Sequence, residues 1–275
     1  MKRVIAMLIG ILMCLTPVSA ILVLGWFSQN CRQRVIRTIF RQGFEFVEDV
    51  EIMSRGHSLN WILGSRNEPS TSRYWPRILG GIKRNSVIGL RTYFVLIVGT
   101  LPFTLLWLFS WWAGWENSFN KGYEQAWVGP ATGIVATILA LYLLNFLPLA
   151  FVHCALFDKW RSYFDIQTLA QIRRMAGWRY VGLVFLTVLL SLPLFAAKTL
   201  PVFIEQIYPD FMEWDERQLE EFKNQVRLAI AAYIFLSLWF LKGLASRIYA
   251  QAIVRVLTRS PDHGLSGFPL VKRVS

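Results

Sequence analysis

Long runs of apolar residues alternate with polar segments along the chain. Five runs are long enough to cross a bilayer, because a hydrocarbon core of about 30 Å needs about 20 helical residues. They are Val4–Phe27, Val87–Trp112, Trp127–Val152, Val181–Phe203 and Leu228–Tyr249. Lipid offers no partners to free backbone N–H and C=O groups, so we predict that each run forms an α-helix.

The runs are continuously apolar, whereas a transmembrane β-barrel would show segments of about 10 residues with alternating apolar and polar side chains. The mean hydropathy of +0.41 and the 55% apolar content also exceed those of soluble domains. We therefore predict an all-α fold, a polytopic membrane helical bundle. It would form a single membrane domain over 1–275, with about five transmembrane helices and two amphipathic helices on the cytoplasmic face.

The first run, Val4–Phe27, allows three interpretations. It could be an uncleaved spanning anchor, which suits the apolar residues that continue for seven positions beyond Ala20. It could instead be a re-entrant hairpin that bends at Pro17 and keeps both ends in the cytoplasm. Lys2, Arg3 and Val18-Ser19-Ala20 also resemble a signal peptide with its cleavage site. The spanning anchor is the interpretation we adopt.

Basic residues are distributed unevenly between the segments that connect the runs. Segments 28–86, 154–179 and 247–275 carry twenty Lys and Arg together, against five in the N-terminus, 113–126 and 205–225. Cytoplasmic loops of membrane proteins are enriched in these residues. We therefore predict a bacterial cytoplasmic (inner) membrane protein with cytoplasmic segments 28–86, 154–179 and 250–275, and hence a cytoplasmic C-terminus. Segment 205–225 is acidic and would lie outside.

Two of the basic segments have the pattern of amphipathic helices. In Cys31–Arg55, Ile36, Phe40, Val47 and Val50 fall near one face at helical spacing. This segment would either lie on anionic lipid or pack on the bundle, and the pattern does not decide between the two. Segment 154–179 would lie along the inner surface. The residues that we expect to contact lipid headgroups are Arg32, Arg34, Arg37, Arg41, Trp160, Arg173 and Arg174.

The formal net charge of +12 raises the question of nucleic acid binding. The basic residues flank the spans and form no single patch, so anionic membrane lipids are the expected partners and nucleic acid is not. A protein partner in a membrane complex is also expected. The three cysteines, Cys14, Cys31 and Cys154, show no CxxC spacing, so we predict no metal site, no disulfide framework and no cofactor.

Polar and helix-bending residues within the runs mark where a site could lie. Lys198 and Lys242 lie near the ends of their runs, so their ammonium groups could snorkel to the membrane surface. The candidate intramembrane polar site is Asn145, Pro148 and His153. We expect the Asn145 side chain to bond a neighbouring helix. Pro102 and Pro193 would bend the other helices that line a path past it.

Catalytic motifs are missing from the sequence, which has no HExxH, GxSxG or Walker loop and no paired carboxylates within a span. His57 near Glu51 and His153 near Asp158 are the nominal candidates for catalysis. We therefore predict no catalytic residues, although a membrane enzyme with scattered residues stays open as an alternative.

Two segments resemble a family of prokaryotic multi-pass membrane proteins of unknown function. The resemblance covers about Trp26–Pro193 and implies a similar number of spans and amphipathic pieces on the inner face, with no known activity. The matching pieces are Gly25-Trp26, Arg34-Val35-Ile36-Arg37, Tyr163-Phe164-Asp165-Ile166, Ile172-Arg173-Arg174 and Arg179-Tyr180.

Three functions are compatible with these features. The leading hypothesis is a non-catalytic accessory or scaffold component of a membrane complex, with 31–55 and 154–179 as its docking and lipid-facing surface. The second is a small transporter or channel, in which kinked helices line a path past Asn145. A lipid-modifying membrane enzyme is the third.

Overall fold

The computed structural model describes residues 2–46, 74–120, 127–157, 159–207, 214–259 and 271–273. The described residues are almost entirely helical, which confirms the all-α prediction. The elements are α1 (Lys2–Met13), α2 (Pro17–Phe40), β1 (Phe44–Phe46), α4 (Tyr74–Asn120), α5 (Val128–Leu144), α6 (Leu147–Phe157), the 3-10 helix η2 (Trp160–Phe164), α7 (Ile166–Ala176), α8 (Trp178–Ile207), α9 (Glu216–Arg259) and β2 (Val271–Arg273). Strands β1 and β2 pair antiparallel.

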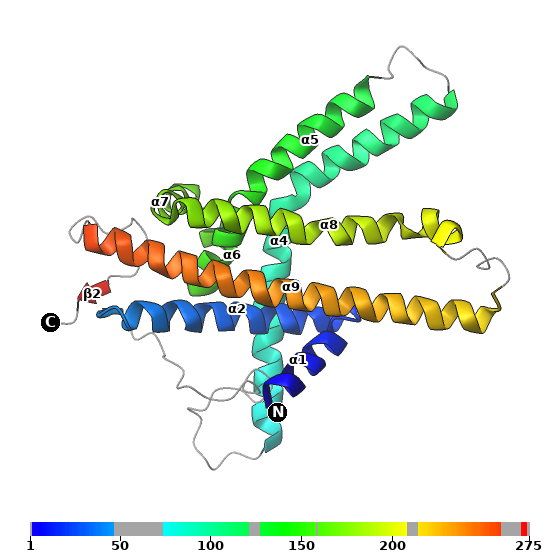
Figure 1. The fold of residues 1–275 in the computed structure, drawn as a ribbon. Helices are drawn as coiled ribbons and strands as arrows, with labels where there is room; N and C mark the ends of the chain where they lie inside the picture. The colour runs from blue at the N-terminus through cyan, green and yellow to red at the C-terminus, as the bar shows by residue number, and fades with distance from the viewer. Residues whose placement is uncertain are drawn as a thin grey trace.

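The first predicted span is not one helix. Helix α1 ends at Met13, and α2 begins at Pro17 with Thr16 as its N-cap, whose hydroxyl accepts a hydrogen bond from the Ser19 N–H. Proline is favoured in the first turn of a helix because its missing N–H would have no partner there. The chain turns at this junction (Figure 1), so the bend at Pro17 that the hairpin interpretation requires is present.

Helix α2 is also longer than the sequence pattern predicts at its other end. It continues through Cys31 to Phe40 without a break, and Val35, Ile36 and Ile39 on this part have no exposed surface. The helical part of the predicted segment Cys31–Arg55 therefore packs on the bundle, as one of the two interpretations requires, and contact of its exposed side with anionic lipid stays a prediction. Residues 47–55 of that segment lie outside the described residues.

Helices α2 and α4 cross at two glycines. A Cβ atom on Gly89 would lie 1.9 Å from the carbonyl oxygen of Ile21, and one on Gly25 would lie 2.0 Å from that of Asn85. Only glycine allows the two backbones to come this close. Beside the crossing, the Gln29 side-chain amide donates to Asn85 Oδ1 at 2.6 Å and accepts from Arg84 at 2.7 Å.

The C-terminal part of α4 and helix α5 form a hairpin that projects from the rest of the molecule (Figure 1). Small residues bring the helices together: Gly129 lies against the backbone of Ser110 and Gly114, and Gly133 lies against the Ser110 hydroxyl. That hydroxyl donates to the Gly129 carbonyl at 2.6 Å. Small residues four positions apart are typical of helix contacts inside membranes. Pro102 lies inside α4 without ending it.

Two helix pairs are bent at short breaks. Helices α5 and α6 meet at 46° around Asn145 and Phe146, and α7 and α8 meet at 107° at Gly177. Gly177 has a φ of +61°, which glycine adopts without strain. The Tyr180 hydroxyl donates to the backbone carbonyl of Asn145 and so satisfies an acceptor that the first break exposes.

Two helices are long and apolar enough to cross a membrane, α4 over Leu79–Gly114 and α9 over Glu216–Thr258. The bent pairs α5–α6 and α7–α8 raise the number to four if each is one span. The described residues thus give two to four candidate spans, at the second to fifth predicted positions, and not the predicted five. The structure supports a multi-pass membrane protein.

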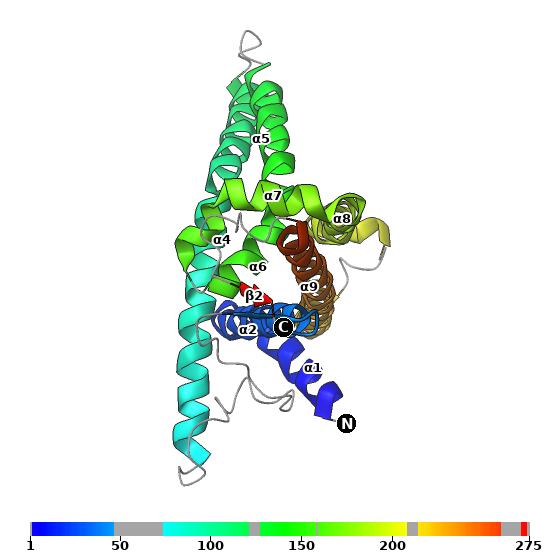
Figure 2. The same cartoon turned by 90° about the vertical axis from the view of Figure 1, so that its left-hand side faces the viewer.

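The core lies where α2, α6, α7 and α9 meet. Helices α2, α8 and α9 run side by side in Figure 1, whereas α7 lies crosswise to them, as Figure 2 shows. The largest fully buried side chains of this core include Ile36, Leu149, Leu169, Tyr180, Tyr249 and Ile253. A smaller aromatic group joins α2 to α9, with the Trp26 and Phe235 rings stacked 6.1 Å apart.

Candidate functional site

Helix α9 carries three buried polar side chains on the face that meets the core. Lys242, Ser246 and Tyr249 are spaced i, i+4 and i+7, which places them on one side of a helix. Their exposed fractions are 8%, 0% and 0%. We call these three residues the α9 polar face. It lies against α2 and α6, and its two ends form two different polar clusters.

Lys242 forms the first cluster. Its Nζ lies 3.9 Å from the centre of the Phe151 ring on α6 and 4.5 Å from that of Phe27 on α2. The described residues offer this nitrogen no hydrogen-bond acceptor. The faces of the two aromatic rings attract the ammonium ion through cation–π contacts, but its N–H groups remain without hydrogen-bond acceptors. The sequence-based expectation that Lys242 snorkels to the surface is wrong, because the neighbouring helices cover it.

Two further residues of α2 lie next to Lys242 along the helix contact. The Cys31 thiol donates to the Lys242 carbonyl at 3.9 Å, and burial raises the pKa of this thiol although the nearby Lys242 charge opposes the shift. Burial lowers the pKa of Arg34. A Cβ atom on Gly243 would lie 2.4 Å from the Arg34 Nη1, so this glycine leaves the room that the guanidinium occupies.

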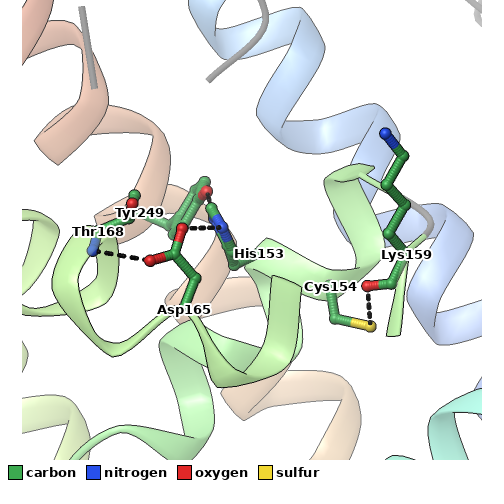
Figure 3. Close-up of polar contacts among 6 residues, drawn as sticks. All are labelled: His153, Cys154, Lys159, Asp165, Thr168 and Tyr249. Atoms are coloured by element: carbon green, nitrogen blue, oxygen red, sulfur yellow. Dashed lines mark hydrogen bonds and ion pairs between the residues drawn. The ribbon is translucent and has the colours of Figure 1, made fainter. Parts of the chain in front are cut away.

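His153 forms the second cluster, drawn in Figure 3. The His153 Nδ1 lies 2.5 Å from the Tyr249 hydroxyl, and its Nε2 lies 3.8 Å from Asp165 Oδ2. The other oxygen of Asp165 accepts from the Thr168 N–H at 3.2 Å and caps α7. His153 is 3% exposed and Asp165 is 35% exposed. The cluster therefore connects a half-buried carboxylate, through an imidazole, to a phenol that has no exposed surface.

This geometry limits the chemistry of the second cluster. A covalent reaction needs a substrate atom within reach of the nucleophile, and Tyr249 is covered on every side by the core. A carboxylate, an imidazole and a phenol that contact one another in a row can exchange protons, and the two outer groups fix the orientation of the imidazole ring. Among the described residues, no group of three or more His, Cys, Asp or Glu side chains could hold a metal ion.

The structure separates the three residues of the predicted intramembrane polar site. Asn145 and Pro148 lie at the α5–α6 break, whereas His153 lies farther along α6 and faces α7 and α9. The predicted hydrogen bond from the Asn145 side chain to a neighbouring helix is not found among the described residues. The backbone carbonyl of Asn145 accepts from the Tyr180 hydroxyl on α8 instead. Asp158 and His57, the nominal catalytic partners, lie outside the described residues.

The residues predicted to contact lipid occupy different environments. Arg32, Arg34 and Arg37 are half-buried on α2, whereas Arg41 is exposed. Trp160 is 51% exposed and lies 5.6 Å from the Arg161 guanidinium. The Arg173 guanidinium lies over the Phe146 ring at 5.0 Å, and Arg174 is exposed.

No family model, curated protein or solved structure matches this chain. The resemblance to the prokaryotic multi-pass family gains no support from these comparisons. What the structure supports is a membrane protein of two to four candidate spans.

One residue that is central to the second cluster was not predicted from the sequence. Tyr249 was assigned to the end of a span, and its role as the partner of His153 was not predicted. The spacing of Lys242, Ser246 and Tyr249 at i, i+4 and i+7 inside an apolar run indicates a polar helix face that includes Tyr249. A polar residue on each of three successive turns gives a helix one polar face, and lipid cannot cover such a face cheaply.

Proposed function

We propose that this protein is a non-catalytic component of a bacterial cytoplasmic membrane that assists a partner complex. The observation that carries this proposal is the contrast between the core and the α4–α5 hairpin. The polar groups of the core mostly bond one another, whereas the hairpin displays large apolar side chains on both helices. The exposed ones include Leu105, Leu108, Trp111 and Trp112 on α4 and Ile134, Val135, Ile138 and Leu141 on α5.

The same proposal includes an orientation. Helix α9 begins with Glu216, Glu220 and Glu221, and its last part, 247–259, carries Arg247, Arg255 and Arg259 without a carboxylate. Between Arg227 and Arg247 the helix rises about 30 Å at 1.5 Å per residue, which matches a hydrocarbon core. Because basic ends of spans favour the cytoplasm, the C-terminal end of α9 would be inside.

A crosslinking experiment tests the partner role. A photoreactive amino acid placed at Leu108 or Val135 on the hairpin should capture a specific protein in intact membranes, identified by mass spectrometry. The matched control is the same probe at Trp239, which is exposed on α9. Capture of one protein from the hairpin but not from α9 supports an accessory component. Lipid adducts alone at all three positions would contradict it.

A transport function is the second candidate, and the unpartnered ammonium of Lys242 favours it. Ionisable groups buried within spans commonly mark ion or substrate pathways, and broken helices often accompany them. Purified protein in liposomes should then conduct or exchange a small anion, and Lys242→Met should abolish the flux. Equal flux through the wild-type protein and the variant would remove Lys242 from any pathway.

A further inference from the structure

The corner between α7 and α8 brings three helices together at one end of the molecule. Helix α7 ends at Ala176, Gly177 makes the turn, and α8 leaves at 107°. The C-terminal part of α9 lies beside this corner, since the Arg255 Nη1 donates to the Met175 carbonyl at 2.9 Å. If α8 crosses the bilayer, α7 lies along its surface, as amphipathic interfacial helices do.

Each of the three helices carries one exposed arginine near this corner. These arginines are Arg174 on α7, Arg179 on α8 and Arg255 on α9. Arg179 donates to the Gln251 side chain at 2.7 Å, so the bonds of Arg179 and Arg255 hold both guanidinium groups next to the turn. Trp178, between them, is 87% exposed, the largest fraction among the apolar side chains of the described residues.

None of the three arginines forms an ion pair with a carboxylate among the described residues. A guanidinium carries five N–H donors, and the bonds described above use one each on Arg179 and Arg255. Because the side chains are exposed, their remaining N–H groups are accessible, and a guanidinium can bind phosphate oxygens in pairs through its fork of donors.

We propose that Arg174, Arg179, Arg255 and Trp178 bind the phosphate group of anionic phospholipid headgroups. A bilayer is the occupant that fits best, because the corner lies beside the C-terminal end of α9, which is a candidate span, and an exposed tryptophan beside cations is typical of a membrane interface. Binding here rests on the membrane insertion in the proposed function, not on the partner complex. The site also differs from the basic residues of α2, of which Arg32, Arg34 and Arg37 are half-buried.

The test measures lipid retention by the purified full-length protein. Native mass spectrometry would count the phosphatidylglycerol and phosphatidylcholine molecules retained from mixed micelles. The wild-type protein should retain phosphatidylglycerol preferentially, and R174Q/R179Q/R255Q should retain at least tenfold less, because each basic residue near an anionic surface contributes roughly a fivefold factor. R174K/R179K/R255K, which keeps the charge, should retain an intermediate amount.

The matched control is R217Q/K223Q/R227Q, which removes the same charge from exposed positions at the opposite end of α9. This control should retain phosphatidylglycerol as the wild-type protein does. Equal losses in both glutamine variants, or no loss in either, would overturn the proposal. Displacement of the lipid by millimolar glycerol 3-phosphate would also overturn it, since the site would then take a soluble phosphate. A missing partner protein would affect only the proposed function, because lipid is counted on the isolated chain.

Discussion

The α2–α6–α9 core and the α4–α5 hairpin are both helical, but they are packed differently. The core buries ionisable and polar side chains, among them Lys242, His153 and Tyr249, against large aromatic and aliphatic groups. In the hairpin, Gly129 and Gly133 meet Ser110 and Gly114, and the large side chains point outward. The core is stabilised by contacts between particular polar, aromatic and aliphatic side chains. The hairpin relies on close backbone contact and on whatever covers its outer surface.

This difference indicates where function can lie. Burying a polar group costs free energy unless it is partnered, so the buried polar groups of the core are the ones that need an explanation beyond stability. The apolar outer surface of the hairpin must be covered by lipid or by another protein, and the proposed function assigns this role to a partner complex. Substitutions in the two regions should therefore change the unfolding free energy by different amounts, and a substitution in the hairpin should leave the core folded.

The largest effect is expected at the α2–α4 crossing, where Gly89→Ala would place a Cβ atom 1.9 Å from the Ile21 carbonyl oxygen. Backbone atoms cannot yield as a flexible side chain can, so the unfolding free energy should fall by about 3 kcal/mol. Thermal unfolding in detergent measures it. Gly80→Ala on the same helix is the control. Its Cβ would meet nothing within 4 Å, so the protein should be equally or slightly more stable. Similar losses in both variants would contradict the close crossing.

A second substitution separates the hairpin from the core. Gly129→Leu should force α5 away from α4 at a cost of about 2 kcal/mol, because Gly129 lies against the α4 backbone. The core should stay folded, so the Cys31 thiol, which is 3% exposed, should resist alkylation in a chain whose other cysteines are alanine. Rapid alkylation of Cys31 in this variant would show that hairpin and core unfold as one unit.

A smaller effect is expected from the polar contacts. Tyr249→Phe leaves the buried Nδ1 of His153 without its partner and should cost about 1–2 kcal/mol. Thr137→Val removes an exposed hairpin contact, the 3.4 Å bond from the Trp107 indole, and should cost less than about 0.5 kcal/mol. Thermal unfolding of the two variants compares them. A larger loss of unfolding free energy in Thr137→Val than in Tyr249→Phe would contradict the difference between core and hairpin.

A further small effect is expected at the α5–α6 break. Asn145→Leu should change the unfolding free energy by about 1 kcal/mol or less, because Tyr180 bonds the backbone carbonyl of Asn145 and not its side chain. Tyr180→Phe should cost more, since it removes the hydroxyl itself. The two variants are compared by thermal unfolding, and a larger loss for Asn145→Leu would give its side chain a role that this geometry does not show.

The helices at the second to fifth predicted positions could be found from the sequence, because a long apolar run requires a helix whatever its neighbours are. The bend in the first run also has a signal in the sequence, because Thr16 followed by Pro17 is typical of a helix start. This signal lies within a long apolar run, which by itself favours a single spanning helix.

The candidate site was less predictable. His153 meets Asp165 only because η2 and the start of α7 fold back onto α6, and spacing along the chain does not specify that turn. Lys242 is buried because Phe27 and Phe151 come from two other helices. Both arrangements depend on tertiary packing, which a local pattern of apolar and polar residues does not determine.

The most direct test of the membrane arrangement is the accessibility of the two ends of α9. Single cysteines at Glu220 and Thr258, both exposed, would be placed in a chain without other cysteines and treated with a membrane-impermeant maleimide in spheroplasts. Labelling at position 220 in intact spheroplasts, and at position 258 only after permeabilisation, is the expected result. Labelling of both positions before permeabilisation, or the reverse order, would contradict a spanning α9 with its basic end in the cytoplasm.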